Sequence, residues 1–235
     1  LSIVLSNPST GGLLTSPATI TCTDPIVRAT LSGGYRYEWL DTHQVNPVRD
    51  LTAANIYNVM AFDINGCPSD ISTVEIISDQ DKPKDLLITP SILDATLTCL
   101  NPTMTLTASS STPNVTYLWN DDLQSTTATI NVTKSRIYQV TVIGQNGCTE
   151  NVDILVSQNK ILPQLSVSST SDKLTCTTTS IQLTGVIANE SEVGTPIVYE
   201  WLDDPAIPQS RTITIPGIYS LRATAANGCI SESSM

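Results

Sequence analysis

Long apolar runs, clustered cysteines and basic residues are all scarce in this chain of 235 residues. No apolar stretch approaches the ~18 residues of a transmembrane helix, so the sequence predicts no membrane span. No two cysteines lie two to four residues apart, and His43 is the only histidine, so the ligand spacing of structural zinc sites is missing. Lysine and arginine number 11 against 22 acidic residues, and the net charge of -11 argues against a nucleic-acid partner.

The main feature of the sequence is a pattern that occurs three times, about 81 residues apart. Its members are a Tyr-x-Trp segment, a later tyrosine, and an Asn-Gly-Cys segment that ends ten residues after that tyrosine. The tryptophans are Trp39, Trp119 and Trp201, and the later tyrosines are Tyr57, Tyr138 and Tyr219. Repetition at a fixed period indicates an array of small domains. We place them at residues 1–82, 83–162 and 163–235, called the first, second and third repeats, and expect the last strand of the third to be incomplete.

The cysteines follow the same pattern, two to a repeat. An even number at regular spacing is typical of a disulfide framework formed in an oxidising compartment. Six cysteines allow 15 pairings, and we take the one that is the same in every repeat. The sequence therefore predicts three bonds, one inside each repeat: Cys22–Cys67, Cys99–Cys148 and Cys176–Cys229.

Alternation of apolar and polar residues predicts an all-β fold. In the second repeat, Met104–Ala108 and Ile137–Val142 alternate with a period of two, as half-buried strands do. Five further short segments have strand character: Leu86–Ile88, Leu97–Cys99, Val115–Trp119, Thr127–Val132 and Val152–Val156. Asn146-Gly147 is a strong hairpin signal. Seven short strands with a tryptophan after the first cysteine predict an immunoglobulin-like β-sandwich in each repeat.

The aromatic residues of the pattern are expected to fill the cores of the three sandwiches. We assign Trp39, Trp119, Trp201, Tyr57, Tyr138 and Tyr219 to the cores. A Tyr-x-Trp pair exposed on a strand could instead stack on sugars, but the tryptophan of such a sandwich is usually buried.

Acidic residues form a column two positions after each tryptophan: Asp41, Asp121 and Asp203, extended by Asp122 and Asp204. Calcium takes six to eight oxygen ligands, whereas one column supplies at most two carboxylates to a repeat. Capping of a turn by aspartate is therefore the preferred interpretation, and calcium at these residues is the alternative. We expect no other metal and no cofactor.

A single histidine offers little for catalysis. His43 lies in a loop that neither other repeat equips with histidine, and a general base also needs a nucleophile and an orienting acid. We expect His43 to be a surface residue and the chain not to be an enzyme.

Over essentially the whole chain, the repeated pattern resembles the immunoglobulin-like or PKD-like repeats of giant cell-surface adhesins of gliding bacteria. The residues that carry the likeness are Leu97-Thr98-Cys99, Tyr117, Trp119, Ile137-Tyr138 and Asn146-Gly147-Cys148, with Pro216-Gly217-Ile218-Tyr219 as the match in the third repeat. The resemblance implies export by the type IX secretion route, a link to gliding motility, and an adhesive or spacer role in surface filaments.

These observations predict a non-catalytic structural or adhesive section of an extracellular bacterial surface protein or filament, acting as a stalk or spacer that presents a binding tip. The expected partners are further repeats of the same polypeptide, copies of the chain in a filament, and a cell-surface glycan or protein receptor. A chain that begins at Leu1 without a signal peptide reads as a piece of a longer secreted polypeptide. The alternative is a set of spacer or carbohydrate-binding modules from a secreted multidomain enzyme.

Overall fold

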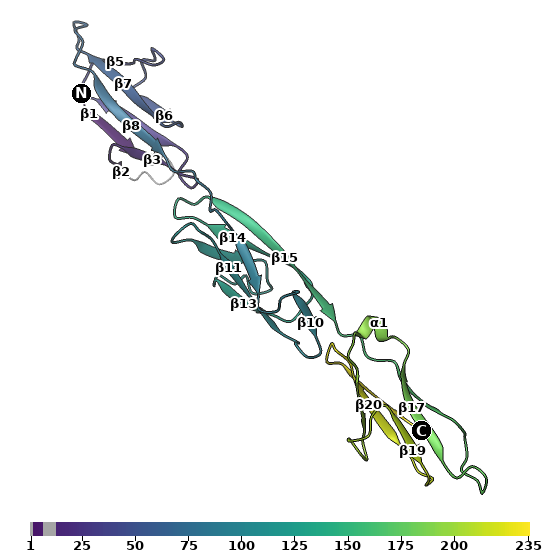
Figure 1. The fold of residues 1–235 in the computed structure, drawn as a ribbon. Helices are drawn as coiled ribbons and strands as arrows, with labels where there is room; N and C mark the ends of the chain where they lie inside the picture. The colour runs from purple at the N-terminus through teal and green to yellow at the C-terminus, as the bar shows by residue number, and fades with distance from the viewer. Residues whose placement is uncertain (1, 7–12) are drawn as a thin grey trace. The chain divides into compact units, whose positions relative to one another are not determined.

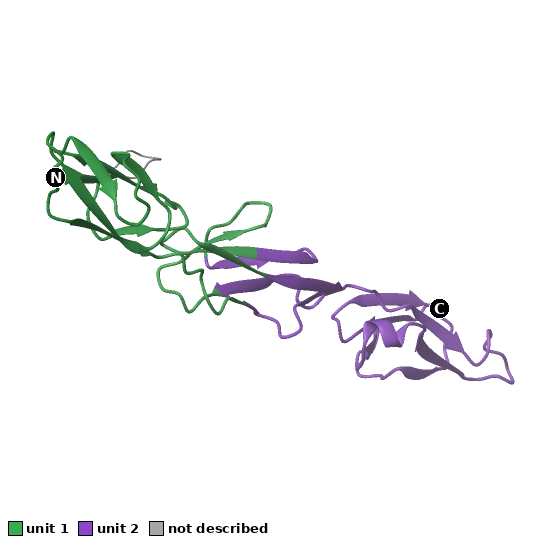
Figure 2. Cartoon of the chain, turned by 90° about the horizontal axis from the view of Figure 1, so that it is seen from above, with its two compact units in different colours: residues 1–87, 109–127, 140–152 green, residues 88–108, 128–139, 153–235 purple. Residues whose placement is uncertain are grey.

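The computed structural model describes residues 2–6 and 13–235, which form short β-strands and one helix of four residues (Figure 1). The prediction of an all-β chain with about three tandem immunoglobulin-like domains is confirmed at this level. The chain divides into two compact units, which are described separately (Figure 2). One unit comprises residues 1–87, 109–127 and 140–152, and the other comprises residues 88–108, 128–139 and 153–235, so the division falls within the second repeat.

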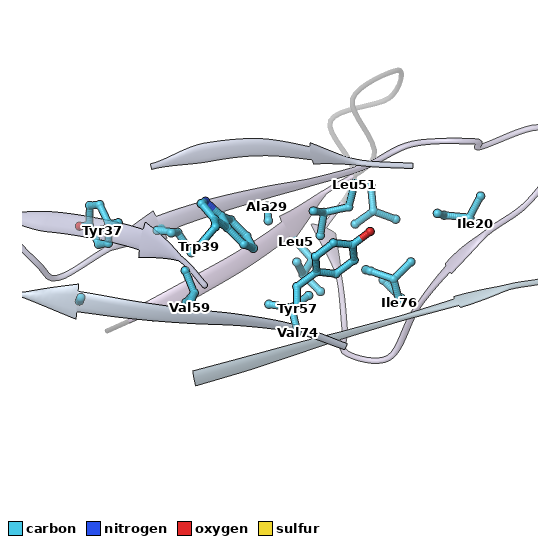
Figure 3. Packing of buried hydrophobic residues seen from close by; sticks show 14 residues of the cluster. Leu5, Ile20, Ala29, Tyr37, Trp39, Leu51, Tyr57, Val59, Val74 and Ile76 are labelled. Atoms are coloured by element: carbon cyan, nitrogen blue, oxygen red, sulfur yellow. The ribbon is translucent and has the colours of Figure 1, made fainter. Parts of the chain in front are cut away.

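The first repeat contains two four-stranded sheets, ordered β2-β1-β4-β6 and β3-β8-β7-β5. Their strands are β1 Ser2–Ser6, β2 Leu13–Leu14, β3 Ala18–Ile20, β4 Val27–Ser32, β5 Arg36–Trp39, β6 Val48–Leu51, β7 Asn55–Phe62 and β8 Ser72–Ser78. Along β7, Tyr57, Val59 and Ala61 are buried, because alternate side chains of a strand face the core. These residues pack with Trp39 in a cluster to which both sheets contribute side chains (Figure 3).

The second repeat contains the seven strands that its sequence predicts. They are β9 Leu87–Pro90, β10 Thr96–Thr98, β11 Met104–Ser109, β12 Thr116–Trp119, β13 Thr129–Val132, β14 Arg136–Ile143 and β15 Thr149–Asn159. They form sheets ordered β10-β15-β14-β12 and β13-β11-β9. As β3 does with β8 in the first repeat, β10 pairs in parallel with the end of β15, so both repeats have the same edge arrangement.

The third repeat has two three-stranded sheets, β16-β17-β19 and β18-β20-β21. Its elements are β16 Leu165–Ser169, β17 Ile181–Ile187, α1 Glu190–Val193, β18 Val198–Trp201, β19 Ser210–Ile213, β20 Ser220–Thr224 and β21 Ile230–Ser234. Trp201 is fully buried against Ile181, Leu183 and Leu221. Each repeat thus builds its core around the tryptophan of its Tyr-x-Trp segment.

The predicted pairing of the cysteines, Cys22–Cys67, Cys99–Cys148 and Cys176–Cys229, is wrong. The structure has two disulfides, Cys22–Cys148 within the first compact unit and Cys99–Cys229 within the second. Each bond joins the first cysteine of one repeat to the second cysteine of the next. Of the six cysteines, all of which lie in the described part of the chain, Cys67 and Cys176 are unpaired.

Strand geometry explains why Cys22 and Cys67 do not meet. Cys67 lies in the turn before β8, whereas Cys22 follows β3, which runs parallel to β8 and pairs with its last residues. The two cysteines therefore lie at opposite ends of β8, a strand whose seven residues span roughly 23 Å. A disulfide needs Cα atoms about 4.4–6.8 Å apart. In both observed bonds they are 5.0 Å apart.

Candidate functional site: the disulfide-linked junctions

One half of each junction is the Asn-Gly-Cys turn. In the first compact unit, the Gly144 N–H donates to the Cys148 carbonyl at 2.9 Å, and the Gly147 N–H donates to the Gly144 carbonyl at 3.0 Å. Gly147 has φ +75°, a left-handed conformation that glycine adopts without steric cost. The Asn146 Oδ1 accepts a bond from the Cys148 N–H at 3.0 Å. These bonds close the turn at Cys148, the residue that leads into β15.

The other half is a turn that begins at threonine, just before the first cysteine of a repeat. The Thr21 N–H donates to the Asp24 carbonyl at 3.0 Å, and the Thr21 Oγ1 accepts from the Asp24 N–H at 3.0 Å. Side-chain oxygens of threonine commonly close such short turns. Cys22 is held between these two residues, directly beyond the end of β3.

At the Cys22–Cys148 junction, the two turns also bind each other through the backbone. The Cys22 N–H donates to the Asn146 carbonyl at 3.0 Å. The Asn146 Nδ2 donates to the Asp79 Oδ1 at 2.8 Å and to the Asp81 carbonyl at 2.9 Å, so one carboxamide holds the segment that links the first two repeats. A Cβ atom on Gly147 would collide with the Thr23 side chain, so the close approach of the turns requires glycine.

An ion pair lies beside the same junction. The Lys82 Nζ is 3.0 Å from the Glu150 Oε2, with both side chains substantially exposed. The hydrogen bond from Lys82 lowers the pKa of the Glu150 carboxyl, and a bond to the Asn151 backbone adds to this effect. Exposed pairs of this kind contribute little to stability, so the disulfide and the Asn146 bonds are the main links.

The Cys99–Cys229 junction in the second compact unit is built in the same way. The Leu100 N–H donates to the Asn227 carbonyl at 3.1 Å, one residue further along than at the first junction. The Asn227 Nδ2 donates to the Asn159 Oδ1 at 3.1 Å and to the Ile161 carbonyl at 2.9 Å, again holding a linking segment. A Cβ atom on Gly228 would lie 2.6 Å from the Leu100 nitrogen. The chain therefore contains the same junction twice.

The two cysteines of the Asn-Gly-Cys turns are deeply buried at these junctions. Cys148 and Cys229 are each 1% exposed, and the Asn227 side chain is buried as well. Burial protects a disulfide from attack by external thiols, because exchange requires access to sulfur. One cysteine of each bond is thus shielded, whereas its partner, Cys22 or Cys99, is exposed.

The six aromatic residues assigned to the cores make the same hydrogen bonds in every repeat. The tryptophan Nε1–H groups donate to backbone carbonyls at 2.9–3.0 Å, Trp39 to Asn46, Trp119 to Thr127 and Trp201 to Pro208. The tyrosine hydroxyls donate to the carbonyl four residues upstream, Tyr57 to Ala53, Tyr138 to Lys134 and Tyr219 to Ile215. The tryptophans, Tyr57 and Tyr138 are buried, whereas Tyr219 is only partly buried. Such tyrosine bonds are typical of immunoglobulin-like sandwiches.

The aspartate column takes part in local contacts. Asp41 binds Arg49 through two bonds of 2.6 and 2.8 Å, and Asp203 binds Arg211 at 2.5 Å. The bond from each arginine lowers the pKa of its aspartate. Arg49 also lies over the Trp39 ring, 5.1 Å from its centroid.

In the second repeat, serine takes the place of the arginine. The Ser125 N–H and hydroxyl donate to the two carboxylate oxygens of Asp121 at 2.7 and 2.6 Å. Asp122 occupies the neighbouring exposed position, and Asp204 accepts a bond from the Ala206 N–H at 3.3 Å. Among the described residues no three His, Cys, Asp or Glu side chains gather as a metal site would require. Asp121 and Asp204 thus cap turns, whereas Asp41 and Asp203 form ion pairs with arginine.

His43 lies at an exposed turn position with φ 56°. Its Nδ1 is 2.8 Å from the Glu38 Oε1, and its side chain is 79% exposed. The structure thus places the histidine at the surface beside a carboxylate.

A hollow opens at one end of the third-repeat core, where Leu174, Ile181, Tyr219 and Met235 are among its lining residues. In the first and second repeats, a short strand paired in parallel with the last strand occupies this edge. No such parallel pair is present among the described strands of the third repeat, where β21 pairs only with β20, in the antiparallel sense.

Comparisons with known proteins identify a fold but no family. No protein family matches the sequence, and no curated protein matches it. A structure from a 1.5-MDa bacterial ice-binding adhesin, studied for host cell surface retention, is similar with a TM-score of 0.50 at 11% identity, covering 100% of this chain and 96% of that one. Murine CEACAM1b is similar with a TM-score of 0.32 at 11% identity, covering 64% of this chain and 97% of that one. Drosophila OTK extracellular domains 3–5 are similar with a TM-score of 0.32 at 11% identity, covering 99% of this chain and 83% of that one. No helix in the described part of the chain is long and apolar enough to cross a membrane.

Proposed function

We propose that this chain is a non-catalytic structural and adhesive section of an extracellular bacterial surface protein or filament. It acts as a stalk whose consecutive repeats are locked together by disulfides and which presents a binding tip away from the cell. The observation that carries the proposal is that both disulfides join one repeat to the next.

A bond between repeats has a mechanical consequence that a bond within a repeat lacks. Tension that reaches Cys22 passes directly to Cys148, and tension that reaches Cys229 passes directly to Cys99. The linking segments that Asn146 and Asn227 hold are thereby bypassed. A covalent link also survives the unfolding of either repeat, which suits a stalk under load.

The chemistry of the chain favours an extracellular location. Disulfides form and persist in oxidising environments, and they are rare in the cytosol of most organisms. A net charge of -11 keeps copies of a secreted protein soluble and apart. The likeness of fold to a bacterial adhesin is consistent with this location, and export by the type IX route with a role in gliding forms the more specific part of the proposal.

Sugar stacking by the Tyr-x-Trp segments gains no support from the site. Trp39, Trp119 and Trp201 are at most 1% exposed, and their indole N–H groups are bound to backbone carbonyls. An aromatic platform needs an accessible ring face. The role of carbohydrate-binding modules in a secreted enzyme therefore ranks second.

Immunogold labelling of intact source cells tests the proposal. Antibodies raised against the purified chain should label unpermeabilised cells at their surface or along appendages, and the label should extend beyond the outer boundary of the envelope. Label found only after permeabilisation would refute a surface stalk. Recovery of the antigen in the medium, joined to a catalytic domain, would support the secreted enzyme instead.

A further inference from the structure

We infer that Cys67 and Cys176 are the two open halves of this same junction, each built to form a disulfide with a neighbouring repeat of the same design. Cys67 would bond the Thr-Cys cysteine of a preceding repeat, and Cys176 the Asn-Gly-Cys cysteine of a following repeat. The inference rests on the proposed function, because it takes further repeats as the partners.

The turn at Cys67 has the conformation of the two turns that are bonded. The Asp63 N–H donates to the Cys67 carbonyl at 3.0 Å, and the Gly66 N–H donates to the Asp63 carbonyl at 3.1 Å. Gly66 has φ +84°, compared with +75° at Gly147 and +77° at Gly228. The turn thus reaches its bonding conformation without a bonded partner.

What differs at Cys67 is the surroundings of the turn. A Cβ atom on Gly66 would meet no described atom within 4 Å, whereas one on Gly147 would collide with Thr23. Cys67 is exposed, whereas Cys148 is 1% exposed. In both turns glycine is needed because the backbone adopts a positive φ. At Gly147 it is needed also because a Cβ atom would prevent the close contact with the first repeat.

Asn65 provides a second observation that points to a missing partner. The Cys67 N–H is bound by the Asp63 Oδ1 at 2.8 Å, so the Asn65 carboxamide is not used to close its own turn. Within the described residues this exposed carboxamide makes no hydrogen bond. The equivalent Asn146 and Asn227 carboxamides each donate twice to a linking segment of the preceding repeat.

The turn around Cys176 matches the other half of the junction. The Thr175 N–H donates to the Thr178 carbonyl at 2.9 Å, and the Thr175 Oγ1 accepts from the Thr178 N–H at 2.9 Å. Thr21 and Thr98 make the same pair of bonds, at 3.0 Å each, around the bonded cysteines Cys22 and Cys99. The chain therefore has the Asn-Gly-Cys half free in its first repeat and the Thr-Cys half free in its third.

Thiol–disulfide exchange with a disulfide oxidant would form the new bond. The thiolate of one cysteine attacks the oxidant, breaks its S–S bond and forms a mixed disulfide, and the second cysteine's thiolate then displaces the remaining oxidant sulfur. One S–S bond forms between the repeats while that of the oxidant breaks. The two protons of the cysteine thiols pass to the two released oxidant thiolates.

Mapping of the protein from its native surface tests the inference. Free thiols are first blocked with N-ethylmaleimide, and the protein is then digested without reduction and analysed by mass spectrometry. We expect Cys67 in a linked peptide with a Thr-Cys sequence, and Cys176 in one with an Asn-Gly-Cys sequence. Blocked Cys67 or Cys176, or either one linked to a cysteine of its own type, would overturn the inference. Immunogold labelling is independent of this result, so the two proposals can fail separately.

A mixing experiment tests whether the two halves recognise each other. The Cys67→Ser chain, with Cys176 free, and the Cys176→Ser chain, with Cys67 free, are mixed in equal amounts under oxidised glutathione. Random oxidation would give twice as much mixed dimer as either homodimer. We expect mixed dimers to exceed each homodimer at least tenfold, and a random ratio or an absence of dimers would contradict recognition.

The turn itself has a matched control in the same repeat. Asn65→Ala, introduced into the chain with free Cys67, should return the dimer ratio towards the random value, because the linking contacts are lost. Asn58→Ala, at an exposed position on β7, should leave the excess of mixed dimer unchanged. Equal effects of the two substitutions would count against a role for Asn65.

Discussion

The first and second repeats carry the same Asn-Gly-Cys turn, but only the second has it buried in a junction. Both turns have a left-handed glycine and the same pair of backbone hydrogen bonds. Cys148 is bonded to Cys22 and nearly inaccessible, whereas Cys67 is exposed. The comparison teaches that the local sequence determines the shape of the turn, and that the preceding repeat determines whether the turn becomes a link.

The largest difference is expected under force. With both disulfides intact, the shortest covalent path between the ends runs from Cys22 to Cys148, back to Cys99 and across to Cys229. That path contains roughly 80 residues, so the oxidised chain should extend to about 280 Å, against about 800 Å after reduction. Single-molecule pulling between the termini measures both lengths.

The pulling experiment has a control variant and a result that would contradict the account. The Cys67→Ser chain should give the same oxidised length as the unmodified chain, because Cys67 carries no load. An oxidised chain that extends to the reduced length would show that the disulfides do not link consecutive repeats.

Removal of a bonded cysteine pair should cost more stability than removal of the open cysteine. The Cys22–Cys148 bond closes a loop with a sequence separation of 126. By loop-closure entropy, the Cys22→Ser, Cys148→Ser double variant should lose about 4–5 kcal/mol of total unfolding free energy. Cys67→Ser should change it by less than about 0.5 kcal/mol. Urea unfolding of both chains measures the difference, and similar losses would remove the distinction between the two turns.

The asparagine of the turn should slow reduction of the disulfide only where its carboxamide is hydrogen-bonded to a linking segment. Asn146→Ala removes two hydrogen bonds to the linking segment and one that closes the turn. Because a typical hydrogen bond contributes about 1 kcal/mol, dithiothreitol should reduce the Cys22–Cys148 bond at least about tenfold faster in this variant. Asn65→Ala should leave that rate unchanged. A rate unaffected by Asn146→Ala would show that the carboxamide does not hold the junction closed.

The smallest expected effect is on the pH dependence of stability, and it arises in the turn after the tryptophan. There Arg49 binds Asp41 in the first repeat, and Ser125 binds Asp121 in the second. Arg49 lowers the pKa of Asp41 in the folded state, so the associated stability is present above the ordinary aspartate pKa and is lost as the pH falls through the lowered value. Arg49→Gln should reduce the loss of stability between pH 5 and pH 3 by less than about 1 kcal/mol.

Thermal unfolding as a function of pH measures this contribution. Arg36→Gln is the matched control, since Arg36 lies over the Phe62 ring, 4.0 Å from its centroid, and should leave the slope with pH unchanged. An unaltered slope in the Arg49→Gln chain would show that the pair with Asp41 adds nothing to acid stability.

The strands could be predicted from the sequence because their signals are local. Alternation over Met104–Ala108 and Ile137–Val142 lies within β11 and β14, and the burial of alternate residues follows from the strand period. The three tryptophans are likewise buried. Their hydrogen bonds to loop carbonyls could not be predicted, because these depend on the path of each loop.

The junctions could not be predicted because their parts are far apart in sequence. We assumed that all six cysteines pair within the chain, and this favoured the bond inside each repeat. A pairing shifted by one repeat is equally regular, but it leaves Cys67 and Cys176 unpaired. One signal was present in the sequence: the second cysteine follows the Asn-Gly turn, at the start of the last strand. The position of the first cysteine beside the end of that strand follows only from the parallel pairing of β3 with β8.

Peptide mapping of the purified chain under non-reducing conditions tests the central claim most directly. After free thiols have been alkylated, the account predicts linked peptides for Cys22 with Cys148 and for Cys99 with Cys229, and alkylated Cys67 and Cys176. Linked peptides for Cys22 with Cys67, or for Cys99 with Cys148, would contradict it.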